Sequence, residues 1–219
     1  MDKKASIILY GLAESTCTQR VVATLTEKGL SFTLQSIDFM GGEHKTATYL
    51  EEKQPFGVIP VLIDENGFKV YESRAICRYL EMKYKGKGTE LIPTKDPKAQ
   101  GLFEQAASVE ISYFDPYASG IVMERVFKKM KGLGDADEAK VTSFKKELST
   151  KLDVYEKILT KQPYLAGETF TLADLFHLPY GAWLVKLGEG NLFESRPHVK
   201  AWWNKITART SWKTVQAMQ

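Results

Sequence analysis

The sequence predicts an α+β protein of two domains, in which a small domain with a mixed sheet precedes a larger all-helical domain. Three observations support this fold class. Short strand-like runs alternate with helical periods over residues 1–84, and the segment 85–97 is rich in Lys, Gly and Pro. Residues 98–219 carry long helical periods and no convincing strand. We therefore expect domains at 1–84 and 98–219, joined by a linker at 85–97.

The elements of the first domain follow from its apolar pattern. Four segments have the short apolar or alternating pattern of strands: 6–11, 31–38, 60–64 and 68–71. Three segments have helical spacing: 18–29, 44–53 and 73–84. Glu65, Asn66 and Gly67 form a turn signal that predicts a hairpin between the last two strands. This order is typical of a mixed four-stranded sheet of thioredoxin type, with helices packed on it.

The second domain is expected to be a helical bundle. One apolar stripe runs along 144–159 and predicts a core-facing helix, formed by Phe144, Leu148, Leu152, Tyr155 and Leu159. Thr171 and Asp174 have the spacing of a capping box at a helix start. Pro197 stands near the first position of a further helix.

Composition and charge narrow the function classes. The 219 residues carry 30 Lys and Arg against 27 Asp and Glu, and the net charge of +3 is too small and dispersed to predict nucleic-acid binding. The two cysteines and three histidines lack metal-ligand spacing, so we expect no metal site. No stretch approaches the roughly 20 apolar residues of a membrane span, and the N-terminus lacks a signal-peptide pattern. We expect a cytoplasmic protein with free thiols and no membrane partner.

The stretch YGLAESTCTQRVV, residues 10–22, places hydroxyl and thiol side chains where a strand gives way to a helix. Ser15 can be a simple helix N-cap, because helix starts favour Ser and Thr. Cys17 is expected to be a buried, small apolar side chain or, alternatively, a redox-active thiol. Cys77 is expected in the core. The stretch alone does not decide which of these groups does chemistry.

Pro60 follows Ile59 in the motif PFGVIP, at the start of a predicted strand. It can be a strand-edge proline, which is common because proline cannot donate to the ladder. It can also be a cis proline, in which case the N–H and C=O of Ile59 would point outward and could pair with an extended peptide.

Two further motifs could bind the ends of such a peptide. Ser73 can be an N-cap, but a helix N-terminus also binds carboxylates, and Glu72 beside it could bind an ammonium group. His44 and Lys45 are either solvated loop charges or a site for a second carboxylate. Together the motifs describe a receptor for a small peptide.

Eight motifs then carry a resemblance over nearly the whole chain. They are ESTCTQRV, GEHK, PFGVIP, YESRAI, YFDPYAS, LDVYEKIL, YLAGETFTLADLFHLP and SRPHVKAWW, and in order and spacing they are similar to the signatures of phi-class glutathione transferases. The resemblance implies a dimeric cytosolic enzyme without a cofactor. Its first domain would hold glutathione as co-substrate, and its helical domain would hold a hydrophobic electrophile or an organic hydroperoxide.

The resemblance also implies a role for single residues. Ser15 matches the catalytic serine, which donates a hydrogen bond to the glutathione sulfur and stabilises the thiolate. The residues implied to hold the glycine carboxylate, the cysteinyl part and the γ-glutamyl end are His44 with Lys45, Ile59, and Glu72 with Ser73, respectively. The implied co-substrate pocket contains Leu12, Met123, Phe127 and Trp183, of which the last three could equally be core residues of the helical domain.

Departures from the family pattern leave alternatives open. Val58 stands where the family commonly has Gln, so a polar contact near the glycine end is expected to be missing. A Cys-dependent thioltransferase or dehydroascorbate reductase would need Cys at the position of Ser15, and Cys17 is displaced by two residues. A non-catalytic carrier of hydrophobic ligands is the other alternative, against which the intact serine and glutathione-binding residues argue.

Overall fold

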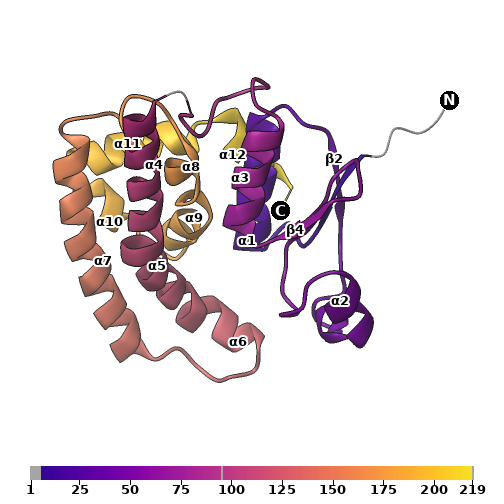
Figure 1. Ribbon diagram of the computed structural model, residues 1–219. Helices are drawn as coiled ribbons and strands as arrows, with labels where there is room; N and C mark the ends of the chain where they lie inside the picture. The colour runs from indigo at the N-terminus through magenta and orange to yellow at the C-terminus, as the bar shows by residue number, and fades with distance from the viewer. Residues whose placement is uncertain (1–5, 95, 219) are drawn as a thin grey trace. The chain divides into compact units, whose positions relative to one another are not determined.

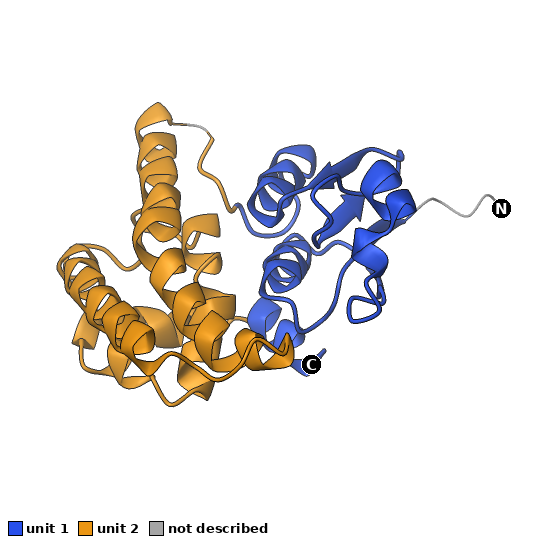
Figure 2. Ribbon diagram, turned by 90° about the horizontal axis from the view of Figure 1, so that it is seen from below, with its two compact units in different colours: residues 1–90, 210–219 blue, residues 91–209 orange. Residues whose placement is uncertain are grey.

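The computed structural model describes residues 6–94 and 96–218 (Figure 1). Residues 1–5, 95 and 219, which fall in the expected first domain, linker and second domain, lie outside the described part. The chain separates into two compact units, one of residues 1–90 with 210–219 and one of residues 91–209 (Figure 2).

The first unit is built on a mixed four-stranded sheet in the order β2-β1-β3-β4. Its strands are β1 (Ile7–Tyr10), β2 (Phe32–Gln35), β3 (Val61–Ile63) and β4 (Lys69–Tyr71). β1 pairs in parallel with β2 and antiparallel with β3, and β3 and β4 form the predicted hairpin. Asp64 closes the hairpin turn, because its Oδ1 accepts hydrogen bonds from the N–H groups of Asn66 and Phe68 at 2.8 and 2.9 Å. The sheet confirms the predicted α+β fold with a thioredoxin-like first domain.

Helices cover both faces of this sheet. The helical elements of the unit are α1 (Thr16–Glu27), the short 3₁₀ turn η1 (Glu43–Lys45), α2 (Ala47–Glu52), α3 (Ser73–Lys83) and α12 (Thr210–Ala217). α1 and α3 lie side by side (Figure 1). Val61 packs with Tyr49 of α2, whereas Leu62, the next residue of β3, is fully buried on the opposite face, because successive strand side chains alternate.

The last helix packs against α1 and belongs to the first unit by its contacts. Ser211 donates a 2.6 Å hydrogen bond to Glu27, whose second carboxylate oxygen accepts one of equal length from Thr89. Lys28 beside them forms a buried ion pair with Glu81 at 2.8 Å. The sequence predicts residues 210–217 in the domain 98–219, because a single sequence does not record which unit a terminal segment packs against.

The second unit, over its described residues, consists of helices and turns with one isolated bridge between Tyr164 and Gly167. The helices are α4 (Pro97–Val109), α5 (Asp115–Val122), α6 (Lys128–Met130), α7 (Glu138–Leu159), α8 (Leu172–Leu175), α9 (Leu178–Lys186), α10 (Asn191–Glu194) and α11 (Pro197–Thr207). Two π-helical stretches, η2 (Glu110–Phe114) and η3 (Met123–Phe127), continue α4 and α5. None of the helices in the described residues is long and apolar enough to cross a membrane.

The packing of this unit follows the predicted signals. Four of the five stripe residues of α7 are buried, and Phe144 at its start is half-buried. Thr171 and Asp174 form the predicted capping box of α8. Pro197 is the first residue of α11, where its missing N–H removes no helical hydrogen bond.

Candidate active site

Ser15 occupies the N-cap position of α1. Its backbone is extended, and its Oγ accepts a hydrogen bond from the N–H of Thr18 at 3.4 Å. Since Oγ is the acceptor in this contact, its own O–H remains available to donate to another group. The first turn of α1 contains no acidic residue, so no carboxylate there offsets the positive end of the helix dipole. The N-cap interpretation is therefore correct, and it leaves a hydroxyl donor beside a helix N-terminus.

The turn between β1 and α1 holds Ser15 in place. The N–H of Ser15 donates to the C=O of Leu12 at 3.1 Å, and the side-chain amide of Gln19 donates to the C=O of Ala13 at 2.9 Å. Leu12 is half-buried in this turn, three residues before the serine. The side chain of Gln19 thus ties the first turns of α1 to the preceding turn.

The peptide bond between Ile59 and Pro60 is cis, as the sharper of the two interpretations of this motif predicted. Neither the N–H nor the C=O of Ile59 makes a backbone hydrogen bond within the described residues. The preceding carbonyl, that of Val58, accepts a hydrogen bond from the hydroxyl of Tyr49 at 3.0 Å. Ile59 therefore offers both backbone groups to an extended peptide.

His44 and Lys45 lie in η1 with different surroundings. The ring of His44 stacks on Phe39 with centroids 3.9 Å apart, and burial and the neighbouring charge of Lys45 lower its pKa. Its Nδ1 is buried without a hydrogen-bond partner in the described chain. Lys45 is exposed and its Nζ donates to the C=O of Phe56 at 3.2 Å. The interpretation as solvated loop charges is thus wrong for His44.

Gly57 allows the loop before β3 to approach η1 closely. Its φ is +60°, and a Cβ at this position would lie 2.6 Å from the carbonyl oxygen of His44. A residue with a side chain would be both strained and in collision here. The absence of a side chain at residue 57 therefore allows the loop before Ile59 to pack closely on the turn that carries His44.

Glu72 and Ser73 begin α3, but not as the simple capping interpretation predicts. Glu72 holds the N-cap position and makes no side-chain cap, while Ser73 is already the first helical residue and is buried. The N-cap interpretation of Ser73 is wrong, because the C=O of Glu72 already accepts the first helical hydrogen bond, from Ile76 at 2.8 Å. Glu72 has a φ of 69°, a conformation that costs a non-glycine residue on the order of 1–3 kcal/mol. Such strain is concentrated at functional sites in proteins.

The sheet brings these segments to one edge. Tyr10, Val61 and Tyr71 are paired across β1, β3 and β4 in a single row. Leu12 and Ser15 follow the first of these residues, Ile59 precedes the second, and Glu72 follows the third. All of these site residues therefore lie at the same end of the sheet. His44 joins them through Phe39, which packs on the apolar cluster beneath α2.

The two cysteines differ in exposure. Cys77 is fully buried as predicted, and burial raises its pKa to about 11. Cys17 is only half-buried, so the expectation of a buried side chain is wrong in degree. Its Sγ lies 3.5 Å from Nη1 of Arg20, one helical turn further along α1. Cys17 is the second residue of α1, and its thiol is partly exposed to solvent.

The co-substrate residues of the second unit form a partly exposed apolar group. The rings of Phe127 and Trp183 have centroids 6.3 Å apart at 70°, and Lys186 lies 4.7 Å above the Trp183 ring. Met123, at the start of η3, is 40% exposed, and the two aromatic residues are half-buried. None of the three is a buried core residue, which disfavours the core interpretation. Leu12 lies in the first unit, in the turn before Ser15.

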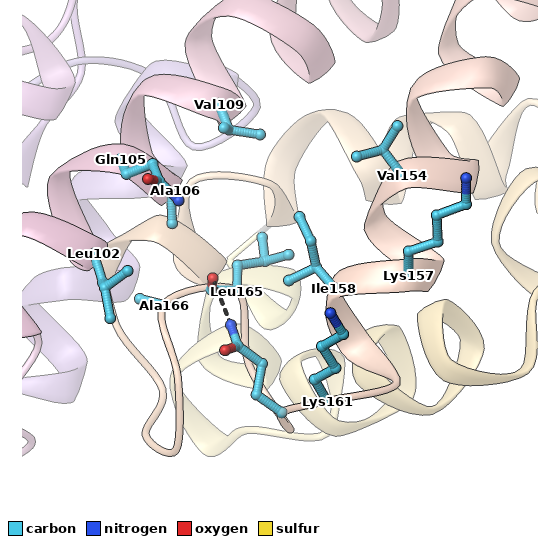
Figure 3. A pocket seen from close by; sticks show the side chains of 11 residues that line it. Leu102, Gln105, Ala106, Val109, Val154, Lys157, Ile158, Lys161, Leu165 and Ala166 are labelled. Carbon is cyan, nitrogen blue, oxygen red and sulfur yellow. Dashed lines mark hydrogen bonds between the residues drawn. The ribbon is translucent and has the colours of Figure 1, made fainter.

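Sequence reasoning missed a cavity of about 310 Å³ in the second unit (Figure 3). Its apolar wall comes from α4, α7 and the following turn, through Leu102, Ala106, Val109, Val154, Ile158 and Leu165. Lys157 and Lys161 stand at its side (Figure 3). The spacing of Leu102, Ala106 and Val109 along one helix face was the available signal.

Sequence reasoning also missed Tyr49, because a tyrosine in a weak helical pattern gives no sign of its hydrogen-bond partner.

Among the described residues, no group of three or more His, Cys, Asp or Glu side chains could hold a metal ion.

Comparison with known proteins decides the family. Residues 9–88 match the family model "Glutathione S-transferase, N-terminal domain", and residues 114–210 match the model "Glutathione S-transferase, C-terminal domain". The chain belongs to the glutathione S-transferase family. This transferase is 57% identical over 199 residues to glutathione S-transferase PM239X14 of Arabidopsis thaliana, with 90% of each chain covered. It is 42% identical over 201 residues to glutathione S-transferase F10 of the same plant, with 91% and 92% covered.

Solved structures agree with this family. The transferase resembles glutathione transferase F7 from Populus trichocarpa with a TM-score of 0.92 and 38% identity, covering 97% of this chain and 98% of that one. It resembles maize glutathione S-transferase I, solved with an atrazine glutathione conjugate, with a TM-score of 0.90 and 32% identity over 98% of both chains. The similar F-type enzymes place this transferase in the phi class. It is an enzyme that conjugates glutathione with electrophiles.

Proposed function

We propose that Ser15 activates the thiol of glutathione and that five residues hold the tripeptide: His44, Lys45, Ile59, Glu72 and Ser73. The observation that carries this proposal is the position of these segments at one end of the sheet, beside the N-terminus of α1. The charge and hydrogen-bonding capacity of each residue match one part of glutathione: the γ-glutamyl end, the cysteinyl part or the glycine carboxylate.

Each part of glutathione has a complementary group. The exposed carboxylate of Glu72 can pair with the γ-glutamyl ammonium group, and the start of α3 at Ser73 can bind its carboxylate. The N–H and C=O of Ile59, which make no backbone hydrogen bond in the described part of the chain, suit the cysteinyl part, which is an extended peptide. The charge of Lys45 and the ring of His44 suit the glycine carboxylate.

The hydroxyl of Ser15 is sufficient to shift the thiol equilibrium. A thiol with an ordinary pKa near 8.5 is only a few per cent ionised at pH 7. Lowering that pKa by about 2 units requires about 2.7 kcal/mol of preferential stabilisation of the thiolate. A hydrogen bond to a charged group contributes about 1.5–3 kcal/mol, and a helix N-terminus adds about 0.3–1 kcal/mol. The two contributions together reach the required range.

The thiolate then attacks an electrophilic carbon of the co-substrate. A carbon–sulfur bond forms, the leaving group departs with the electron pair of its former bond, and the thiol proton has already gone to solvent. Met123, Phe127 and Trp183, with Leu12, are proposed to hold the apolar part of the electrophile. The atrazine glutathione conjugate in the related maize enzyme supports an aromatic electrophile.

The same thiolate suits a second reaction, the reduction of organic hydroperoxides. Two glutathione molecules give up two protons and two electrons, the O–O bond breaks, and an alcohol, water and glutathione disulfide form. The partly exposed apolar side chains of Met123 and Phe127 favour hydroperoxides with an apolar body over hydrogen peroxide. A hydrophobic hydroperoxide and hydrogen peroxide, assayed side by side, test this preference.

We also propose a cytoplasmic homodimer. The resemblance to dimeric cytosolic transferases supports both parts. Two surface features support the dimer further. Phe56 is 71% exposed, yet its backbone is fixed by Gln54 at 2.5 Å and by Lys45 at 3.2 Å. The second unit carries an apolar cavity of about 310 Å³ that can receive an aromatic side chain of another copy.

Light scattering during gel filtration tests the dimer. Phe56→Ser should lower the apparent mass toward that of the monomer, and Ala106→Phe, which fills the cavity, should do the same. Leu133→Ser removes an apolar side chain of similar exposure, 64%, and should leave the mass unchanged. A monomeric wild-type chain would contradict the proposal.

Ultraviolet absorbance of the bound thiolate tests the role of Ser15. Wild-type protein with glutathione should titrate about 2 pH units below free glutathione, and Ser15→Ala should titrate close to the free value. S-methylglutathione, which has no thiol, should give no titration. A wild-type complex whose sulfur titrates like that of free glutathione would refute the proposed role.

A further inference from the structure

Tyr49 of α2 is buried, and its hydroxyl reaches a backbone group of another segment. Only 4% of the residue is exposed. Its O–H donates to the carbonyl oxygen of Val58 at 3.0 Å. Burial, together with the negative charge of Glu43, raises the pKa of Tyr49 to about 12. The hydroxyl therefore keeps its proton, and its function as a donor, at every pH at which an enzyme of this type is assayed.

The peptide plane explains why this contact concerns glutathione. The C=O of Val58 and the N–H of Ile59 belong to the same peptide group, which is planar and holds them in opposite directions. A donor that fixes the carbonyl of Val58 therefore also fixes the direction of the Ile59 N–H. That N–H makes no backbone hydrogen bond within the described residues. It is the group that the proposed function assigns to the cysteinyl carbonyl.

The ring of Tyr49 is itself held firmly. It forms a buried cluster with Ile37 and Val61, against which four half-buried side chains pack: Tyr10, Phe39, Ile59 and Tyr71. Each of these four adjoins or contacts a part of the proposed glutathione site. Phe39 stacks on His44, Tyr71 precedes Glu72, and Tyr10 precedes the turn to Ser15. The buried packing of the ring therefore fixes the position of the hydroxyl.

The apolar side chain of Val58 makes the hydrogen bond from Tyr49 more important in this chain. Its side chain is apolar and 40% exposed, so it cannot add a polar contact to glutathione at this position. The loop that carries it lies outside the strands. Tyr49 thus provides a hydrogen bond that orients this segment where the side chain of residue 58 provides none.

We propose that Tyr49 is a positioning residue, whose hydroxyl orients the Val58–Ile59 peptide so that the N–H of Ile59 meets the cysteinyl carbonyl of glutathione. This proposal rests on the proposed role of Ile59. Tyr49 does not touch the sulfur in this scheme. It acts on glutathione binding and leaves activation of the thiol to Ser15.

The variant Tyr49→Phe removes the hydroxyl and little else. We expect the KM for glutathione to rise about three- to tenfold, because the hydrogen bond that orients the Val58–Ile59 peptide is lost. The KM for the electrophile, kcat at saturating glutathione and the pKa of the bound thiol should stay at wild-type values. A purely structural role would change stability without this division between kinetic constants.

Tyr79→Phe is the matched control. It removes a hydroxyl from the same unit, where Tyr79 donates to the carboxylate of Asp64. This variant should lose stability and keep the wild-type KM for glutathione. An equal rise in KM in both variants would overturn the proposal, as would a raised thiol pKa in Tyr49→Phe.

S-methylglutathione separates this proposal from the role of Ser15. Its affinity, measured by calorimetry, should fall about three- to tenfold in Tyr49→Phe and stay unchanged in Ser15→Ala, because the probe has no thiol. If the Tyr49→Phe variant is unstable, both chains are measured in sucrose, which favours the folded state. Unchanged affinity in Tyr49→Phe would overturn the proposal.

The amide resonance of Ile59 separates it from the role of that residue. In the wild-type chain the resonance should shift when S-methylglutathione binds, and in Tyr49→Phe the shift should be smaller. No shift in the wild type would refute the role of Ile59 itself. A full shift in the variant would refute only the role of Tyr49.

Discussion

The Oγ of Ser15 accepts a hydrogen bond from the N–H of Thr18 at 3.4 Å, so the residue that caps α1 keeps its own hydroxyl proton free to donate. Capping uses a lone pair of the oxygen, whereas stabilising a thiolate uses the proton. One side chain can therefore perform both tasks at once. This explains why the sequence alone, which shows only a serine at a helix start, could not separate the two.

The first prediction distinguishes Ser15 from Cys17 as the group that acts on glutathione. Ser15→Ala should lower kcat/KM for conjugation about 10- to 100-fold at neutral pH, because a hydrogen bond to a charged sulfur is lost. Cys17→Ala should stay within about twofold of the wild type, since its thiol is half-buried and contacts Arg20. Conjugation of an aryl halide measures both. The reverse order of the two effects would favour the thioltransferase alternative.

The second prediction concerns Val58, whose side chain is 40% exposed where the family commonly has Gln. Val58→Gln should lower the KM for glutathione about three- to tenfold, because the amide can donate a hydrogen bond near the glycine end. Val58→Leu, which adds size without polarity, should leave the KM unchanged. Initial rates at varied glutathione concentration give the answer. Equal constants in all three chains would show that no contact is missing.

The third prediction is a pH dependence of stability that depends on Asp64. Burial alone would raise the pKa of this carboxyl, but hydrogen bonds from Lys83, Tyr79 and two backbone N–H groups hold it well below its ordinary value. A lowered folded-state pKa means that the stabilisation is present above the unfolded value near 3.9 and is lost as the pH falls below it. The contribution of this carboxyl to the free energy of unfolding should therefore be level from pH 7 to 5 and fall below about pH 4.

Asp64→Asn shows how much of that dependence comes from this carboxyl. The variant should be less stable by about 2 kcal/mol at pH 7, and the difference should shrink on acidification below about pH 4. Asp153→Asn, which weakens the ion pair with Arg196 at its exposed carboxylate, should cost less than about 1 kcal/mol. Urea unfolding at a series of pH values measures both. A difference that stays constant down to pH 2 would exclude the proposed network.

The fourth prediction tests whether α12 supports the sheet unit. Trp212 is 1% exposed, and the neighbouring Ser211 donates to the buried Glu27. Trp212→Ala should therefore lower stability by about 3–5 kcal/mol, as large buried aromatic residues do when truncated. Lys213→Ala lies on the exposed side of the same helix and should have little effect. Thermal unfolding would show comparable midpoints for the two variants if α12 contributed nothing.

Local signals made most of the first unit predictable. Alternating residues marked the strands, Asn66 and Gly67 marked the hairpin, and the helix ends lay within a few residues of their predicted positions. Relations between distant segments were not visible in the same way. The hydrogen bond from Tyr49 to Val58 spans nine residues and depends on how α2 packs, which no periodicity records. The positive φ of Glu72 was likewise not readable from the sequence, since glutamate does not favour this conformation.

The residue types and their order in the sequence identified the candidate site residues. The structure corrected the expected environment of three of them. His44 is stacked and buried, Ser73 is not a cap, and Cys17 is only partly covered. In each case the residue type was compatible with two environments. Packing against neighbours from other elements decided between them, and a single sequence does not contain that packing in readable form.

The fifth prediction concerns the aromatic pair of the second unit. Phe127 and Trp183 meet edge to face, 6.3 Å apart, and both are half-buried, so an apolar ligand could cover the area that they still expose. Trp183→Ala should raise the KM for a hydrophobic electrophile about tenfold and leave the KM for glutathione unchanged, because the lost area contacts only the electrophile. A small, polar electrophile should discriminate less between the two chains, since it buries little apolar surface.

The exposed Val185, two positions along α9, provides the control for Trp183→Ala. Val185→Ala removes apolar surface from the same helix without touching the aromatic pair, so both kinetic constants should match the wild type. If Trp183→Ala instead raised the KM for glutathione, or affected polar and apolar electrophiles equally, the side chain would act through folding of its helix. The comparison of two electrophiles therefore separates a substrate contact from a stability effect within a single variant.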